Sequence, residues 1–71
     1  MVTLDDLKNW FTYHAPNEAQ LEHYHAIRDA AFDFAAVILA HTLSGADQTS
    51  ALRKIREAVM TANASIACGG E

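Results

Sequence analysis

The chain has little of the chemistry that stabilises a small protein. Its 71 residues include one cysteine, so no disulfide can form within the chain, and only one proline and three glycines. Below roughly 70–80 residues, a single hydrophobic core rarely supplies more than about 3–5 kcal/mol. Such chains are usually completed by a disulfide, a metal or oligomerisation. With the disulfide excluded, we expect self-association, and a metal is the weaker alternative.

Positive charge is also scarce. Five Lys and Arg residues face nine Asp and Glu residues, which gives a net charge of −4. The one local cluster of cations is Arg53, Lys54 and Arg56, and acids lie around it. Binding to DNA or RNA through counterion release needs many clustered cations. We therefore expect no DNA or RNA partner, although a few placed cations are enough for a small anionic ligand.

Long apolar runs are absent as well. The longest strongly apolar stretch, Ala35 to Ala40, is far shorter than the ~20 residues that span a bilayer. The N-terminus carries Asp5 and Asp6, where a secretion signal would be basic. We expect no membrane partner and a cytoplasmic location. A hydrophobic content of 51% favours a folded chain over a disordered one.

Helical patterns account for most of what is present, and we predict an all-α fold. We expect one domain over residues 1–71, with a short helix over 4–10, an extended arm over 11–16, a long helix over 18–43 and a last helix over 46–67. The short loop between the two long helices predicts an antiparallel hairpin. Because the hairpin is so small, we expect it to assemble into a homo-oligomer.

Polar residues mark the expected helix starts. Thr3 is a suitable N-cap for the first helix. Asn17, followed three residues later by Gln20, has the pattern of a capping box, and so has Ser44 followed by Asp47.

Apolar residues recur at spacings of three and four along both long helices, which predicts a packed seam. One set is Tyr24, Ile27, Ala31, Phe34 and Ile38, and the other is Leu52, Ile55, Val59, Ala62 and Ile66. From Ala35 to Ala40 the helix is apolar on nearly every side, and one neighbouring helix cannot cover all of it. Further subunits are therefore implied.

Four ring-bearing residues within five positions form the strongest local signal, namely Trp10, Phe11, Tyr13 and His14. Such rings can stack on nucleobases. They can equally hold the arm against the helices, and composition alone favours this structural interpretation. Arg28 stands beside the apolar seam of the long helix. It is either an ion-pair partner or an anchor for a ligand, and its planar guanidinium suits phosphate.

Other candidate chemistry is weaker. Glu22 and His25 have the spacing used in di-metal helical bundles, but the additional inward-facing Glu is missing, so a solvated surface is favoured. Cys68 has no His near it in sequence and stands at a helix C-terminus, where the dipole does not activate a thiol. We expect no catalytic residue, metal or cofactor.

Several segments together resemble one family, the small phage anti-CBASS sponge proteins, which sequester the cyclic oligonucleotide messengers of bacterial defence. The matching segments are Phe11-Thr12-Tyr13-His14 with Pro16, then Gln20, Tyr24-x-x-Ile27-Arg28, Ala51-Leu52, Glu57-Ala58-Val59-Met60 and Ala62-Asn63-Ala64-Ser65-Ile66-Ala67. The first and last of these are fairly specific as a pair. Together the segments cover most of residues 11–67 in the family's order.

The resemblance implies a helical homo-oligomer, a hexamer in characterised members, with ligand pockets between protomers in the host cytoplasm. It implies that Tyr13 stacks on a base of a cyclic dinucleotide such as cyclic GMP-AMP, and that Arg28 contacts phosphate. Phe11 and His14 belong to the same segment and are expected to contribute to the site. No catalysis is implied, because a sponge binds and holds its ligand.

Three positions depart from the family's pattern. Ala15 stands where Pro is common, Thr61 where Trp is common and Cys68 where Arg is common. Since some members hold cyclic trinucleotides in a second pocket, the missing cation at Cys68 puts that pocket in doubt. Two alternatives stay open at this point, a helical protein-interaction module without a small ligand, and a di-metal protein built around Glu22 and His25.

Overall fold

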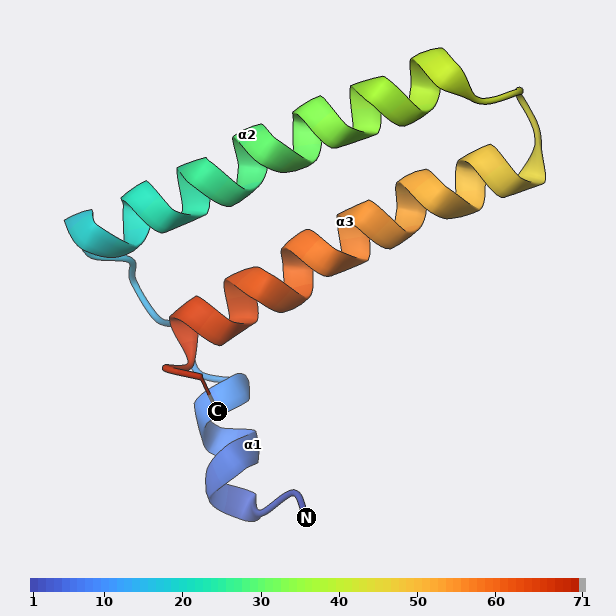
Figure 1. Cartoon of the computed structure of the whole chain (residues 1–71). Helices are drawn as coiled ribbons and strands as arrows, with labels where there is room; N and C mark the ends of the chain where they lie inside the picture. Colours follow the sequence, from blue (N-terminus) through green and yellow to red (C-terminus); the bar gives the residue numbers. More distant parts are fainter. Residues whose placement is uncertain (71) are drawn as a thin grey trace.

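The computed structural model describes residues 1–70, which form three helices and no strand. The first, α1, spans Leu4–Trp10, the second, α2, spans Glu18–His41, and the third, α3, spans Ala46–Ala67. Figure 1 shows α2 and α3 side by side and antiparallel, with α1 beyond the C-terminal end of α3. The predicted all-helical hairpin is confirmed.

Capping boxes begin α1 and α2. The Thr3 hydroxyl accepts a hydrogen bond from the Asp6 backbone N–H at 3.1 Å, and the Asp6 carboxylate accepts one from the Thr3 N–H at 2.8 Å. Asn17 and Gln20 exchange the same two bonds at 2.8 and 3.1 Å. Each box satisfies backbone donors that have no partner within the helix. Both caps are as the sequence predicts.

The predicted end of the long helix at residue 43 is wrong, because α2 ends at His41. Thr42 is extended, with φ −123° and ψ 163°, and its hydroxyl donates to the Ile38 carbonyl at 2.6 Å. A threonine hydroxyl bonded to the carbonyl four residues earlier competes with the regular helix ladder. This bond occupies a carbonyl of the last turn, and Leu43 lies outside the helix.

The predicted capping box of Ser44 and Asp47 is also wrong. The N-cap of α3 is Gly45, at φ 157°, and no side chain caps the helix. A side chain at this φ would be strained, which is why glycine fits the position. Gln48 instead reaches back to α2, where its amide donates to the Thr42 hydroxyl at 3.0 Å and to the Leu39 carbonyl at 3.4 Å.

The arm is turned at its start, where the sequence predicted an extended backbone over 11–16. The Phe11 N–H donates to the Leu7 carbonyl at 3.0 Å, and the Thr12 hydroxyl donates to the Lys8 carbonyl. These two bonds continue the direction of α1 for two residues. Residues 13–17 then have no regular structure and lead into α2.

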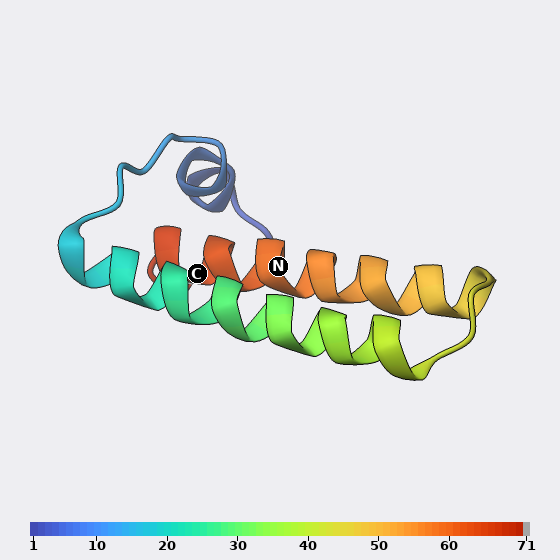
Figure 2. The same ribbon diagram turned by 90° about the horizontal axis from the view of Figure 1, so that it is seen from above.

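The predicted seam between α2 and α3 is present. The five α3 positions are half-buried, and so are four of the five α2 positions, Tyr24, Ile27, Ala31 and Ile38. The exception is Phe34, which is 58% exposed. Most of the half-buried residues line the groove between the two helices. The hairpin is one layer thick (Figure 2), and the shortest extent of the molecule is 16 Å, little more than one helix of about 10–12 Å. Accordingly, no described residue is fully buried.

The exposed area shows how far this chain is from a self-sufficient domain. A compact monomer of 7.8 kDa is expected to expose about 4,400 Å². This chain exposes 5843 Å², roughly a third more. Much of the excess is apolar, since large hydrophobic side chains stand exposed on every helix. Among residues 1–70, no helix combines the length and apolar character needed to cross a membrane.

Candidate functional site

The aromatic side chains of the arm divide into two groups. Phe11 and Tyr13 are 83% and 85% exposed, so their rings are available to a ligand or to another chain. Trp10 is 43% exposed and lines a small hollow of about 340 Å³ beside the last turns of α3, together with Thr61 and Ser65. In this chain Trp10 therefore lies against α3, whereas the rings of Phe11 and Tyr13 are exposed.

His14 faces back toward α1. Its Nε2 lies 2.7 Å from the Asn9 carbonyl oxygen, so Nε2 carries the hydrogen and donates it. The half-buried Cys68 thiol lies 3.9 Å from the same oxygen. His14 thus joins the arm to the end of α1, and this contact holds the residue directly after Tyr13.

Arg28 stands on α2, whose first turn directly follows the arm. The residue is exposed, and it forms no hydrogen bond or ion pair with any other described residue. At ~1.5 Å per residue, Arg28 lies roughly 16 Å along the helix from its Asn17 cap. Within this chain the guanidinium is therefore free to bind an anion. Tyr13 lies in the arm before α2 and Arg28 lies near the middle of α2, and no hydrogen bond joins the two residues within the described part of the chain.

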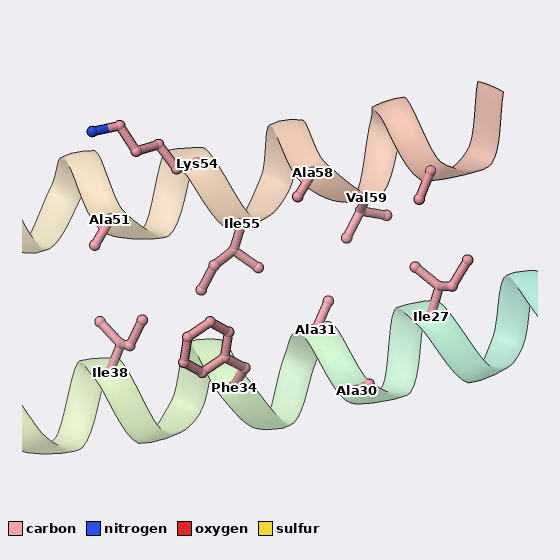
Figure 3. Close-up of a pocket in the computed structure, with 11 residues that line it drawn as sticks. Ile27, Ala30, Ala31, Phe34, Ile38, Ala51, Lys54, Ile55, Ala58 and Val59 are labelled. Atoms are coloured by element: carbon pink, nitrogen blue, oxygen red, sulfur yellow. The ribbon is translucent and has the colours of Figure 1, made fainter. Parts of the chain in front are cut away.

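An apolar groove of about 730 Å³ lies between α2 and α3. Figure 3 shows Ile27, Ala31, Phe34 and Ile38 of α2 facing Ile55 and Val59 of α3, while Lys54 directs its amine away from α2. Lys54 is the one charged residue of the lining, and Tyr13 and Arg28 are not part of it. A groove this apolar suits an apolar helix surface far better than a ligand with two phosphates.

Asn63 is a polar residue that the sequence did not single out. Its side-chain oxygen is buried and has no hydrogen-bond partner among the described residues. A buried acceptor without a donor costs about 1–3 kcal/mol. Asn63 belongs to the Ala62–Ala67 segment that carries the resemblance, so a signal was present in the sequence, but nothing in its spacing marked the residue as special. It is a further candidate for contact with a ligand or a second chain.

The predicted spacing of Glu22 and His25 leads to no metal cluster in one chain. Both residues are exposed on the first turns of α2. Across residues 1–70, no three His, Cys, Asp or Glu side chains gather in a way that could hold a metal ion.

The family of the chain follows from comparison with known proteins. A family model described as "Acb2/Tad1, hairpin domain" matches residues 4–67, which include all three helices and the arm. The chain belongs to this family. It is the anti-CBASS family of cyclic oligonucleotide sponges, so the resemblance read from the sequence is confirmed. Comparisons with curated proteins and with solved structures give no match.

The exposed arm lies within the range that matches the Acb2/Tad1 family. The family binds cyclic oligonucleotides, and binding rather than catalysis is its general activity. The matched range includes Phe11, Tyr13, His14 and Arg28. All four candidate residues therefore lie within the part of the chain that defines the family.

Proposed function

We propose that this protein is a phage-encoded sponge that binds cyclic dinucleotides, such as cyclic GMP-AMP, and thereby blocks CBASS immunity in the host cytoplasm. Family membership over residues 4–67 is the observation that carries the proposal. The exposed Tyr13 ring and the free Arg28 guanidinium support it, because the two groups match the bases and phosphates of such a ligand.

The binding site is proposed to form between protomers. A cyclic dinucleotide has two phosphates, and one chain offers a single Arg28 on α2. Two chains related by a two-fold axis would supply two guanidinium groups, which suits a ligand with the same symmetry. This arrangement also explains how a chain of net charge −4 can bind an anion, since the placement of two cations matters more than the total charge.

Self-association is the second part of the proposal. The apolar groove between α2 and α3 and the missing core both call for a further copy of the chain. The excess exposed area of about 1,400 Å² over a compact monomer exceeds the ~800 Å² that each partner buries in a standard interface. More than one interface per chain is therefore favoured, in keeping with the expected hexamer.

The proposal is tested by calorimetric titration of the protein with cyclic dinucleotides and cyclic trinucleotides. The control is the linear dinucleotide of the same sequence, which has the same bases but lacks the closed ring. We expect saturable binding of at least one cyclic dinucleotide, with one ligand for each pair of chains. If no member of the panel binds, the sponge proposal fails, and a protein-interaction module becomes the better explanation.

Replacing Tyr13 by alanine should weaken dinucleotide binding by the loss of base stacking, which is worth about 1–3 kcal/mol for each base. Because a two-fold site loses two rings, the expected loss is about 2–6 kcal/mol, or at least roughly 30-fold in Kd. Tyr13→Phe keeps the ring and should keep most of the affinity. Both variants should retain the wild-type mass, because the ring is exposed in the chain. Equal affinity of the alanine and phenylalanine variants, measured by calorimetry, would show that the arm is only structural.

A further inference from the structure

The C-terminal end of α3 receives side-chain amides from both sides of the arm. The Asn9 amide of α1 donates to the Cys68 carbonyl at 3.1 Å. The Gln20 amide of α2 donates to the Ile66 carbonyl at 3.3 Å, which also accepts a 3.5 Å bond from the Gly69 N–H. The last carbonyls of a helix lack partners within it, so these contacts satisfy groups that would otherwise need water.

The Gln20 side chain forms two hydrogen bonds, one within α2 and one to α3. Its oxygen accepts from the Asn17 N–H at 3.1 Å, while its NH₂ group donates to Ile66. Asn17 directly follows the arm and is the N-cap of α2. The end of the arm is therefore tied to the first turn of α2, and through the same amide to α3.

Asn9 links the start of the arm to α3 in a similar way. Its side chain holds α3, and its carbonyl accepts the bond from His14 at 2.7 Å. The arm is therefore flanked by two residues, Asn9 before it and Gln20 after it, whose side chains both donate to carbonyls at the C-terminal end of α3. Tyr13 stands between these two attachments, with its ring exposed.

We propose that Asn9 and Gln20 are positioning residues, which fix the arm on the C-terminal end of α3 so that Tyr13 is held where the ligand's base will stack. This inference rests on the proposed function. A loop held at both ends samples fewer conformations, so a larger fraction of chains has the ring in place. Loss of one of these attachments lowers the fraction of chains that has the ring in place. The apparent Kd rises by the same factor by which that fraction falls.

The substitution Gln20→Glu should remove the hydrogen bond to the Ile66 carbonyl while it keeps the capping bond to Asn17. Glutamate at this position still accepts the Asn17 N–H and suits a helix N-terminus. It cannot donate to the Ile66 carbonyl, and it sets a carboxylate against that oxygen. We expect an unchanged oligomer mass and a Kd for cyclic dinucleotide raised about tenfold, as for a competent fraction reduced to about a tenth.

The chain offers a matched control at the other end of the hairpin. Gln48 occupies the same third position of α3 that Gln20 occupies in α2, and its amide also donates to the end of the neighbouring helix. Gln48→Glu removes the hydrogen bonds that this amide donates, far from the arm. Its Kd should equal that of the wild type, and an equal loss of affinity in both variants would show a general effect on the hairpin instead.

A double-mutant cycle tests whether Gln20 acts through Tyr13. In a Tyr13→Ala background the ring is gone, so Gln20→Glu should weaken binding no further, whereas independent effects would multiply. Multiplied effects would overturn the positioning role, and so would an unchanged Kd for Gln20→Glu alone.

The rate of proteolysis in the absence of ligand tests the attachment of the arm independently of the proposed function. Chymotrypsin cleaves after Phe11 and Tyr13, and Gln20→Glu should speed cleavage there while Gln48→Glu leaves the rate unchanged. Equal cleavage rates in the two variants would overturn the attachment. If the wild type binds no cyclic nucleotide, the sponge proposal and the positioning role both fail, and the cleavage rates still decide whether Gln20 holds the arm.

Discussion

Replacement of Arg28 by alanine should abolish cyclic dinucleotide binding while the oligomer stays intact. The side chain is exposed and unpaired among the described residues, so its loss leaves no charge buried without a partner. A hydrogen bond to a charged group contributes about 1.5–3 kcal/mol, and a two-fold site would lose that contribution twice. The expected loss is therefore about 3–6 kcal/mol, or at least about a hundredfold in Kd.

Two further variants make the Arg28 measurement specific. Arg28→Lys keeps the charge but not the planar fork, so its affinity should lie between those of the wild type and the alanine variant. Arg53→Ala removes one cation from an exposed position of α3 and should bind as the wild type does. An unchanged Kd for Arg28→Ala, measured by calorimetry on protein of wild-type mass, would contradict the proposed phosphate contact.

Replacement of Phe34 by aspartate should break the oligomer apart. In the single chain Phe34 is 58% exposed at the groove between α2 and α3, so a lone hairpin would tolerate a carboxylate there. In an oligomer that fills the groove, the substitution loses the burial of a large side chain, about 1.5–3 kcal/mol. It also leaves a charge without a partner in an apolar contact, which costs several kcal/mol more.

Light scattering over a range of protein concentrations measures this effect. We expect the dissociation constant of the assembly to rise at least about a hundredfold, and helix content and ligand binding to fall with it. Ser50→Asp adds the same charge at an exposed position outside the groove and should keep the wild-type mass. Wild-type mass and binding for Phe34→Asp would show that no second chain occupies the groove.

The sequence was sufficient for the features that depend on near neighbours. Asn17 and Gln20 are three residues apart, and their capping box is formed as predicted. The spacing of three and four placed Ile27 and Ile55 at the hairpin seam. The start of α3 was harder to predict. Ser44 and Asp47 have the pattern of a capping box, but the helix begins after Gly45, whose backbone adopts a φ that other residues rarely adopt.

Contacts between distant residues could not be predicted in the same way. Asn9 and Cys68 are separated by 59 positions, and no local pattern links an amide on a short helix to the last carbonyl of another. The division of the aromatic cluster had the same cause, since Trp10 lines a hollow beside α3 while the Tyr13 ring is 85% exposed. Tyr13 and Arg28 were singled out from sequence because ring and guanidinium chemistry is visible without a fold. Whether they meet around one ligand is a property of the assembly.

A sponge holds an intact cyclic nucleotide and does no chemistry on it. The most direct measurement is to saturate the protein with a cyclic dinucleotide, remove unbound ligand, digest the protein with a protease and analyse what is released by mass spectrometry. We predict release of the unchanged cyclic molecule, at one per pair of chains. Release of a linear or hydrolysed product, or retention of no ligand at all, would contradict the proposed sponge function.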